Sequence, residues 1–413
     1  MASESRQYEL ILLGATGYTG RLTAEHITTH LPTDLKWAIS GRNGTKLTQC
    51  AEELRKLNPD RSQPGIEILE LNNEELDTLV RKTRLVITTV GPFMQYGTPV
   101  VEACAKNGTH YVDCTGEVPW VFDMISKYHD MAQASGAIMI PQSGFDSAPA
   151  DLIAFVVATH LRRTLNVSTA EVLTSVDVKS NPSGGSLLTA LSMFDFYSSS
   201  QIADSYKPFA LSPVQPPVSS APPSQSFRTN FFGTRYDREL GFLADWYQSA
   251  MDTAVVQRSW GLLAGGEAYG PNFRFGEWMA AKSSFHATMV HLKMAFGMTI
   301  VLLSPVRWIL KKLVTRPGDG PAPKAAKNDY AHFRAVGVAD SPNHERVVAT
   351  LKVKGSLYSF TGLAIAEAAM VILRGGETEA KKLGGGILTP ATLGDEYVER
   401  LRAVGVEFDV KIL

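Results

Sequence analysis

The chain has few cysteines and no excess of either charge. Its three cysteines among 413 residues, Cys50, Cys104 and Cys114, are too few and too irregularly spaced for a disulfide scaffold or a zinc site. The 40 basic and 41 acidic residues nearly cancel, whereas a face that binds DNA or RNA needs a basic excess. We therefore expect a reducing compartment, structural thiols and no nucleic acid as a partner.

Metal-binding and targeting patterns are missing as well. His286 and His291 lie five residues apart, without cysteine or acidic companions at metal-ligand spacing, so no metal site is predicted. The first ten residues, MASESRQYEL, contain neither an apolar core nor a basic leader. The sequence therefore predicts a cytoplasmic protein. It gives no indication of the oligomeric state.

The first 150 residues alternate between strand and helix patterns. At 413 residues the chain exceeds the size at which one core stops growing, so we expect two domains. Repeated strand–helix units are typical of a doubly wound parallel sheet. We predict an α/β fold in which residues 1–150 form a Rossmann-type domain, with strands at 8–13, 35–40, 66–71, 85–90, 111–114 and 137–140.

Beyond residue 150 this alternation ends. Residues 151–383 are predicted to form a second, α+β domain on a mostly antiparallel sheet, because the candidate strands are rich in β-branched residues. A proline-rich loop is expected at 207–226. Residues 384–413 are predicted to give a helix and a strand that pack back on the core. The expected strands are 170–178, 331–339 and 347–358, and the expected helices 150–163, 185–199, 240–249 and 360–374.

The stretch LILLGATGYTG, residues 10–20, predicts a dinucleotide site. An apolar run breaks into glycines that let a tight turn approach a pyrophosphate, and the following helix points its positive N-terminal end at that anion. The spacing GxxGxxG is by itself weak, because any tight strand-to-helix turn favours glycine. The predicted cofactor-binding residues here are Gly14, Ala15, Thr16, Gly17, Tyr18, Thr19 and Gly20.

Arginine rather than a carboxylate follows the second strand. Ser40 ends that strand and Arg42 lies just beyond it, where NAD-binding domains place an acidic residue and NADP-binding domains accommodate an arginine. A guanidinium pairs with a phosphate and offers nothing to a bare diol. We predict NADP(H) as the cofactor, bound in part by Ser40 and Arg42; the alternative is an arginine that caps a loop.

The remaining loops at the carboxyl ends of the strands lie at the same edge of the sheet, which is called the mouth here. Ligands bind at this edge in such sheets. Tyr96 is a candidate proton donor, although a tyrosine in such a turn more often packs. Asp146 is a second candidate, with helix capping together with Ser147 as the alternative. Glu117 is either a base or a first-turn residue. Further predicted cofactor-binding residues are Val90, Gly91, Pro92, Phe93 and Thr115.

One apolar segment does not fit the simple interpretation of the chain as a soluble enzyme. Met294 to Val306 carries no charge over 13 residues, which is shorter than the roughly 20 that span a bilayer. Basic residues mixed with Trp308 and aliphatic side chains follow it, as in a helix that lies in a membrane interface. Segment 294–314 is therefore either a core helix with a charged exit, a lid, or a peripheral contact with membranes or lipid droplets.

Five motifs in this order resemble the saccharopine dehydrogenase-like oxidoreductases, nearest the branch of the trans-acting enoyl reductases. They are GATGYTG at 14–20, SGR at 40–42, the run from Thr88 to Glu117, SGFDSAPAD at 143–151 and the tail from Gly384 to Val410. The resemblance spans most of the chain and is weakest from about 200 to 260. It implies an NADP-linked Rossmann domain joined to an α/β substrate domain.

We therefore expect an NADPH-dependent oxidoreductase that reduces a C=C, C=N or C=O bond of a hydrophobic acyl, polyketide or related metabolite. An NADP-binding protein at a membrane or lipid droplet, without turnover, is the alternative. A saccharopine-type amino-acid dehydrogenase is a third option, because its dicarboxylate substrate would need converging arginines. The sequence offers Arg228, Arg235, Arg238, Arg258 and Arg274, which no spacing groups.

Overall fold

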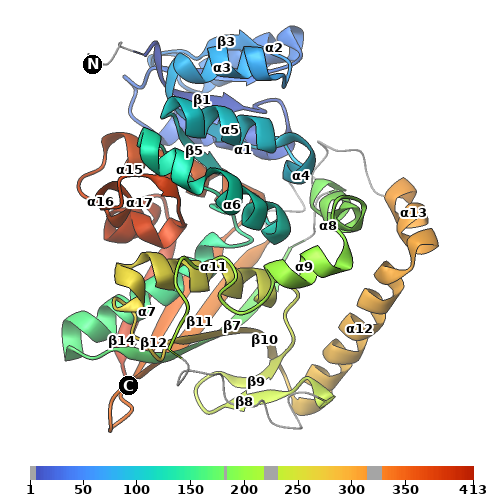
Figure 1. Ribbon diagram of the computed structural model, residues 1–413, viewed down its shortest axis with the longest axis vertical. Coiled ribbons are helices and arrows are strands. Elements are labelled where there is room, and N and C mark those ends of the chain that lie inside the picture. Colours follow the sequence, from blue (N-terminus) through green and yellow to red (C-terminus); the bar gives the residue numbers. More distant parts are fainter. Residues whose placement is uncertain (1–5, 181–183, 218–230, 314–327) are drawn as a thin grey trace.

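The computed structural model describes residues 6–180, 184–217, 231–313 and 328–413, and contains two seven-stranded sheets (Figure 1). The predicted proline-rich loop lies outside the described residues from residue 218 on, as does residue 314 of the apolar segment. The N-terminal domain, blue in Figure 1, occupies one end of the molecule and the second sheet the other.

The first sheet is parallel throughout, with the order β13-β6-β5-β4-β1-β2-β3. Buried apolar runs form its central strands, as predicted for strands covered on both faces. The Rossmann-type prediction is confirmed. Its strands are β1 (Tyr8–Leu13), β2 (Trp37–Gly41), β3 (Gly65–Ile68), β4 (Thr83–Thr88), β5 (His110–Asp113), β6 (Ile138–Ile140) and β13 (Gly386–Ile387). Its helices are α1 (Tyr18–His30), α2 (Gly44–Leu57), α3 (Asn73–Arg81), α4 (Phe93–Tyr96), α5 (Thr98–Asn107) and α6 (Val118–Ser135).

The second sheet has the order β14-β12-β11-β7-β10-β9-β8, and only β7 and β10 pair in parallel, so the mostly antiparallel prediction is confirmed. Helices α7 (Ala148–Leu165) and α11 (Ser249–Leu262) pack on it. The strands are β7 (Thr169–Lys179), β8 (Arg235–Asp237), β9 (Gly241–Ala244), β10 (Arg274–Ala281), β11 (Tyr330–Ala339), β12 (Arg346–Lys354) and β14 (Glu407–Ile412). Other helices are α8 (Gly184–Phe196), α9 (Ser199–Ser205), η2 (Ala264–Gly266), α12 (Ser284–Leu302), α13 (Ser304–Leu313), α15 (Leu357–Arg374), α16 (Glu379–Lys382), η3 (Pro390–Leu393) and α17 (Gly394–Ala403).

Two sequence predictions in this domain are wrong. The helix expected at 240–249 is instead the strand β9, because the Asp237 carboxylate accepts the N–H groups of Glu239 and Leu240, and Gly241 takes a φ of +79° that closes a hairpin. The strand expected to reach Tyr358 ends at Lys354. There Gly355 turns the chain and Ser356 caps α15.

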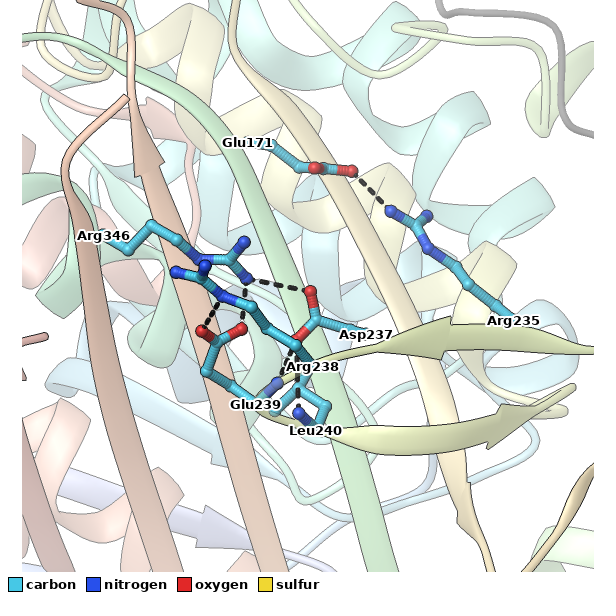
Figure 2. A network of polar contacts seen from close by, with 7 residues as sticks. All are labelled: Glu171, Arg235, Asp237, Arg238, Glu239, Leu240 and Arg346. Atoms are coloured by element: carbon cyan, nitrogen blue, oxygen red, sulfur yellow. Dashed lines mark hydrogen bonds and ion pairs between the residues drawn. The ribbon is translucent and has the colours of Figure 1, made fainter. Parts of the chain in front are cut away.

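Ion pairs hold this hairpin on the sheet (Figure 2). Arg346 at the start of β12 contacts Asp237 at 2.8 Å and Glu239 at 2.6 Å, and Arg235 contacts Glu171 of β7 at 2.9 Å. Arg238 pairs with Glu239. Since β8 is one edge strand and β12 lies next to the other, the network connects the two sides of the sheet.

Helix α15 joins the two sheets. It packs on α1, where Gly362 meets the backbone of Leu22 and Thr23 so closely that a Cβ would be only 2.9 Å from the Thr23 nitrogen. The buried Glu367 carboxylate contacts His26 of α1 at 2.8 Å and Arg400 of α17 at 2.7 Å. The C-terminal residues form β13 in the first sheet and β14 in the second, so this part of the chain connects the two sheets.

Candidate functional site

The glycine-rich loop runs from the end of β1 into α1. Gly14 takes a φ of +91°, and a Cβ there would lie 2.8 Å from Thr89 Oγ1 and from Val90 Cγ2. A Cβ on Gly20 would overlap the Gly14 carbonyl. Glycine is therefore required at both positions by close packing, as the sequence pattern predicts.

The N-terminus of α1 is left open to a ligand. Its N-cap residue is Gly17, which has no side chain to accept an N–H, and its first turn holds no acidic residue. Side chains cap α2 (Asn43), α3 (Asn72) and α15 (Ser356), whereas α1, like α5, α6 and α7, begins without a side-chain cap. The first N–H groups of α1 and its dipole thus suit an anion such as a pyrophosphate.

Arg42 lies at the exposed end of β2. Within the described parts of the chain its guanidinium has no hydrogen bond and no ion pair, and the capping of the following helix is done by Asn43, whose side chain accepts the Lys46 N–H at 3.0 Å. The alternative that Arg42 caps its loop is wrong. Two residues earlier, Ser40 Oγ is buried and has no hydrogen-bond partner among the described residues. An arginine that no described side chain or carbonyl engages, next to the N-terminus of α1, fits a second phosphate.

The third loop, from Val90 to Phe93, is held by Glu117. Both oxygens of this carboxylate accept backbone N–H groups at the start of α4, from Phe93 at 2.8 Å and Met94 at 2.6 Å. Glu117 is thus neither a free base nor merely a first-turn residue. The ring of Phe93 is buried against Trp120, so only its backbone is oriented toward the mouth. Gly91 is exposed, and Pro92 precedes α4.

Asp113 connects the next two loops. Its carboxylate accepts the Tyr111 hydroxyl at 2.6 Å and the N–H groups of Thr115 and Gln142 at 2.9 Å each. Thr115, predicted to bind cofactor, is buried, and its hydroxyl accepts the Glu117 N–H at 3.1 Å. Burial raises the pKa of Asp113 to about 6, while its hydrogen bonds act in the opposite direction.

These buried carboxyls predict that the protein is less stable at neutral than at mildly acidic pH. Burial raises the pKa of Glu117 from 4.5 to about 7, so the folded protein binds a proton more tightly than the unfolded chain does. The stability from this proton is complete below a pH of 4.5 and is lost as the pH rises through about 7. We expect the free energy of unfolding in urea to fall over that window, by on the order of 1–3 kcal/mol per such group.

The Glu117→Gln variant should show a shallower fall over the same window, because Gln does not titrate. The histidines whose pKa values burial lowers, His30, His110 and His129, act in the opposite direction over this window, so the comparison between wild type and Glu117→Gln isolates the contribution of Glu117. The same pH dependence in both proteins would contradict this account.

Asp146 reaches across to the second domain. It accepts the Gln248 Nε2 group at 2.6 Å, and a Cβ on Gly116 would lie 3.5 Å from its Oδ2 and 2.9 Å from the Met251 sulfur. Ser147 is the N-cap residue of α7 but makes no capping bond, so the capping alternative for this pair is wrong. Asp146 therefore lies where the loops after β5 and β6 meet the start of α11.

Tyrosines from both domains surround the same region. Tyr18 of α1 meets Tyr358 of α15 edge to face, with ring centroids 5.3 Å apart. Tyr247, just before α11, is 69% exposed. Tyr96 is exposed at the end of α4, and its hydroxyl bonds to none of the residues that the structure describes.

The other reactive side chains have structural surroundings. Burial raises the pKa of all three cysteines, which disfavours the thiolate needed by a nucleophile. His291 pairs with Asp245 at 2.6 Å, and His286 accepts the Lys282 N–H. Within the described ranges no group of three or more histidine, cysteine, aspartate or glutamate side chains is placed to hold a metal ion.

The apolar segment forms an exposed arm, defined here as α12 and α13 (Figure 1). None of the described side chains from 294 to 312 is buried, and Phe296 is 69% and Trp308 61% exposed. The core-helix alternative is therefore wrong. With 19 residues α12 is also long and apolar enough to cross a membrane. The mostly buried α15 has the same property, so length and composition alone do not assign a membrane contact to α12.

Relatives and one solved structure match nearly the whole chain, and a family model matches its N-terminal part. Residues 10–140 match the family model described as the saccharopine dehydrogenase NADP binding domain. A protein named trans-acting enoyl reductase from Mycobacterium ulcerans is 30% identical, with 98% of each chain covered, and one of that name from Mycobacterium tuberculosis is 28% identical over the same share. The saccharopine dehydrogenase (L-Glu forming) of Saccharomyces cerevisiae matches in structure, with a TM-score of 0.55 and 11% identity over 98% of this chain and 100% of that one.

Proposed function

The chain belongs to the saccharopine dehydrogenase-like oxidoreductases, in the branch of the trans-acting enoyl reductases, and from this premise we propose that it reduces the C=C bond of a hydrophobic enoyl substrate with NADPH. A bound NADPH would supply the hydride. The observation that carries the proposal is the open N-terminus of α1 together with Arg42, which has no partner among the described residues, one strand away. These are the two groups that a pyrophosphate and a 2′-phosphate require.

The roles of the chain's own residues follow from their positions. The loop from Gly14 to Gly20 would hold the pyrophosphate, and Arg42 the 2′-phosphate. The loop from Val90 to Pro92, held in place by Glu117, would lie along the nicotinamide ribose. Tyr96 and Asp146 are the proposed proton donors at the mouth, and Asp146 is the better placed because it meets the second domain through Gln248.

A dicarboxylate substrate is less well supported than an acyl one. Arg235 and Arg238 are already paired with carboxylates (Figure 2). Arg258 is buried, and its guanidinium donates to the backbone carbonyls of Leu211 and Ile387. Arg228 lies outside the described residues, and Arg274 is engaged by another contact. Among the described candidates, Arg235, Arg238, Arg258 and Arg274, these engagements leave no convergent set for the saccharopine-type alternative.

The reaction class is tested with purified protein, NADPH and a panel of long-chain enoyl thioesters, imines and ketones. We expect oxidation of NADPH with the enoyl thioester and little with the others, and a strong preference over NADH. Turnover with the ketone alone would show that the protein reduces C=O bonds and not the proposed C=C bonds. Tight NADPH binding without turnover on any member would favour the alternative of a binding protein without catalysis.

We further propose that the arm of α12 and α13 contacts a membrane or lipid-droplet surface from which an acyl substrate is taken. Exposed apolar side chains on α12 lead into α13, where Lys312 lies over the Trp308 ring at 3.5 Å. Aromatic and aliphatic side chains with adjacent lysines are typical of interfacial helices. Arg307 over the Phe194 ring at 5.0 Å joins the arm to α8.

Replacing Leu302, Leu303 and Trp308 together with serine should abolish pelleting with anionic liposomes. All three side chains are more than half exposed, so the fold should persist. Each buried side chain of this size contributes on the order of 1.5–3 kcal/mol, and the combined loss exceeds tenfold in partitioning. Leu57→Ser, a similarly exposed leucine on α2, is the matched control and should pellet normally. Unchanged pelleting of a folded triple variant would count against membrane contact through the arm.

A further inference from the structure

The side chain of Gln248 connects the second domain to the proposed proton donor Asp146. Gln248 is the N-cap residue of α11 and is 3% exposed. Its Nε2 group donates to Asp146 Oδ1 at 2.6 Å. Nearly one turn later, Met251 lies against the loop after β5, where a Cβ on Gly116 would be 2.9 Å from its sulfur. The start of α11 therefore packs against both loops of the first domain on which Asp146 and Gly116 lie.

The two carboxyl oxygens of Asp146 have different surroundings. Oδ1 is bonded to Gln248, whereas Oδ2 accepts no hydrogen bond from any residue in the described ranges. A Cβ on Gly116 would lie 3.5 Å from Oδ2, and the glycine brings no side chain over it. Oδ2 is also not one of the buried polar atoms without a partner, so it keeps contact with the surface. Oδ2 is thus the oxygen that is left for a substrate or for water.

The bond from Gln248 favours the ionised form of Asp146. An N–H group that donates to a carboxylate forms a stronger hydrogen bond than one that donates to a neutral carboxyl. The positive end of α11, a helix of 14 residues, begins at Gln248 and acts in the same direction. Burial raises the pKa of Asp146, while the bond from Gln248 lowers it. An acid whose charged form is stabilised in this way gives up its proton more easily.

We propose that Gln248 is a positioning residue that holds Asp146 Oδ1, leaves the acidic proton on Oδ2 and stabilises the carboxylate that forms when this proton is transferred. This role rests on the proposed function. A hydride added to the β-carbon of an enoyl thioester leaves an enolate, and the electron pair of the enolate takes the proton at the α-carbon. The O–H bond of Asp146 breaks, a C–H bond forms, and solvent restores the proton at Oδ2.

Three other titratable groups interact electrostatically with Asp146. Cys114 follows β5, Tyr247 precedes Gln248 in the chain, and Asp252 lies in the first turn of α11. None of the three donates a hydrogen bond to Asp146 within the described part of the chain. A substitution at Gln248 leaves all of them in place, so a change in the protonation of Asp146 reports the loss of the Gln248 bond.

The role is tested kinetically with Gln248→Met, which keeps a long unbranched side chain and removes the donor. The lost bond is stronger to the carboxylate than to the neutral acid, so kcat for an enoyl thioester should fall about tenfold, with the KM for NADPH unchanged. Because this bond lowers the pKa of Asp146, the alkaline fall in kcat should move to higher pH. Gln257→Met is the matched control on α11, since Gln257 accepts the Phe209 N–H instead, and it should behave like the wild type.

A double-mutant cycle separates an action through Asp146 from a general structural effect. Asp146→Asn should lower kcat, and the addition of Gln248→Met should lower it no further. A further tenfold loss in the double variant, or an alkaline fall that does not move in Gln248→Met, overturns the role of Gln248. Circular dichroism checks the fold, and Gln248→Leu takes the place of Gln248→Met if the latter does not fold.

Infrared difference spectroscopy reads the protonation of Asp146 without turnover. Its carboxylate band is the one that Asp146→Asn lacks, and its appearance is followed as the pH is raised in the protein without substrate. We expect the band to appear at higher pH in Gln248→Met than in the wild type. The same titration in both proteins overturns the positioning role even where the wild type is an active reductase. If the wild type reduces no enoyl thioester, the proposed function fails, while the titration still decides whether Gln248 controls the protonation of Asp146.

Discussion

Replacing Arg42 with alanine should weaken the binding of NADPH about 10- to 100-fold and leave the binding of NADH nearly unchanged. The reason is that its guanidinium, exposed and without a partner among the described residues, is the cationic group at the end of β2 where a 2′-phosphate would lie. A hydrogen bond to a charged group contributes about 1.5–3 kcal/mol, which corresponds to this range of affinity.

Isothermal titration with both nucleotides measures the difference directly. Arg55→Ala, an exposed arginine in the last turn of α2, is the matched control and should bind both nucleotides like the wild type. Arg42→Lys should retain part of the preference, since an ammonium keeps the charge but loses the two-pronged geometry. An equal loss of NADPH and NADH affinity in Arg42→Ala would remove Arg42 from cofactor selection.

Replacing Gly20 with alanine should abolish measurable binding of both nucleotides. The new Cβ would overlap the Gly14 carbonyl, and Thr89 Oγ1 lies 2.8 Å away on the other side, so neither the loop nor α1 can keep its position. Overpacking of this kind costs about 1–3 kcal/mol, and here it falls on the turn that must approach a pyrophosphate. Unlike Arg42→Ala, this change should not distinguish the two nucleotides.

Gly297→Ala is the control for this variant, because a Cβ at that position on α12 meets nothing within 4 Å. Circular dichroism should show that Gly20→Ala keeps its helices while fluorescence titration with NADPH shows no saturation. Wild-type affinity in a folded Gly20→Ala protein would mean that the close packing of Gly20 on Gly14 does not shape the cofactor site.

The Rossmann-type domain was predictable because its signals are local. A buried apolar strand followed by Gly14, Gly17 and Gly20 places a turn and a helix within a few residues, and Arg42 comes at the end of the next strand. Each loop at the mouth follows its own strand directly. The periodicity of neighbouring residues was therefore enough to predict the fold of this domain and to propose which loops bind the cofactor.

The substrate half was not predictable, since its residues come together only through tertiary packing. Gln248 donates to Asp146, which is about 100 positions away in the sequence. The helix wrongly expected at 240–249 gave no indication of the strand β9 and the turn after it, which place Gln248 next to Asp146. The exposure of α12 is a tertiary property too, because an apolar run alone is equally typical of a core helix.

The most direct test of the account is transfer of deuterium to an enoyl thioester from NADPH that carries deuterium at both C4 positions of the nicotinamide, followed by mass spectrometry of the product. The account predicts a saturated thioester that carries one deuterium at its β-carbon, and a second at the α-carbon only when the reaction is run in D₂O. An unchanged thioester, or NADPH oxidised without deuterium in the acyl chain, would contradict it.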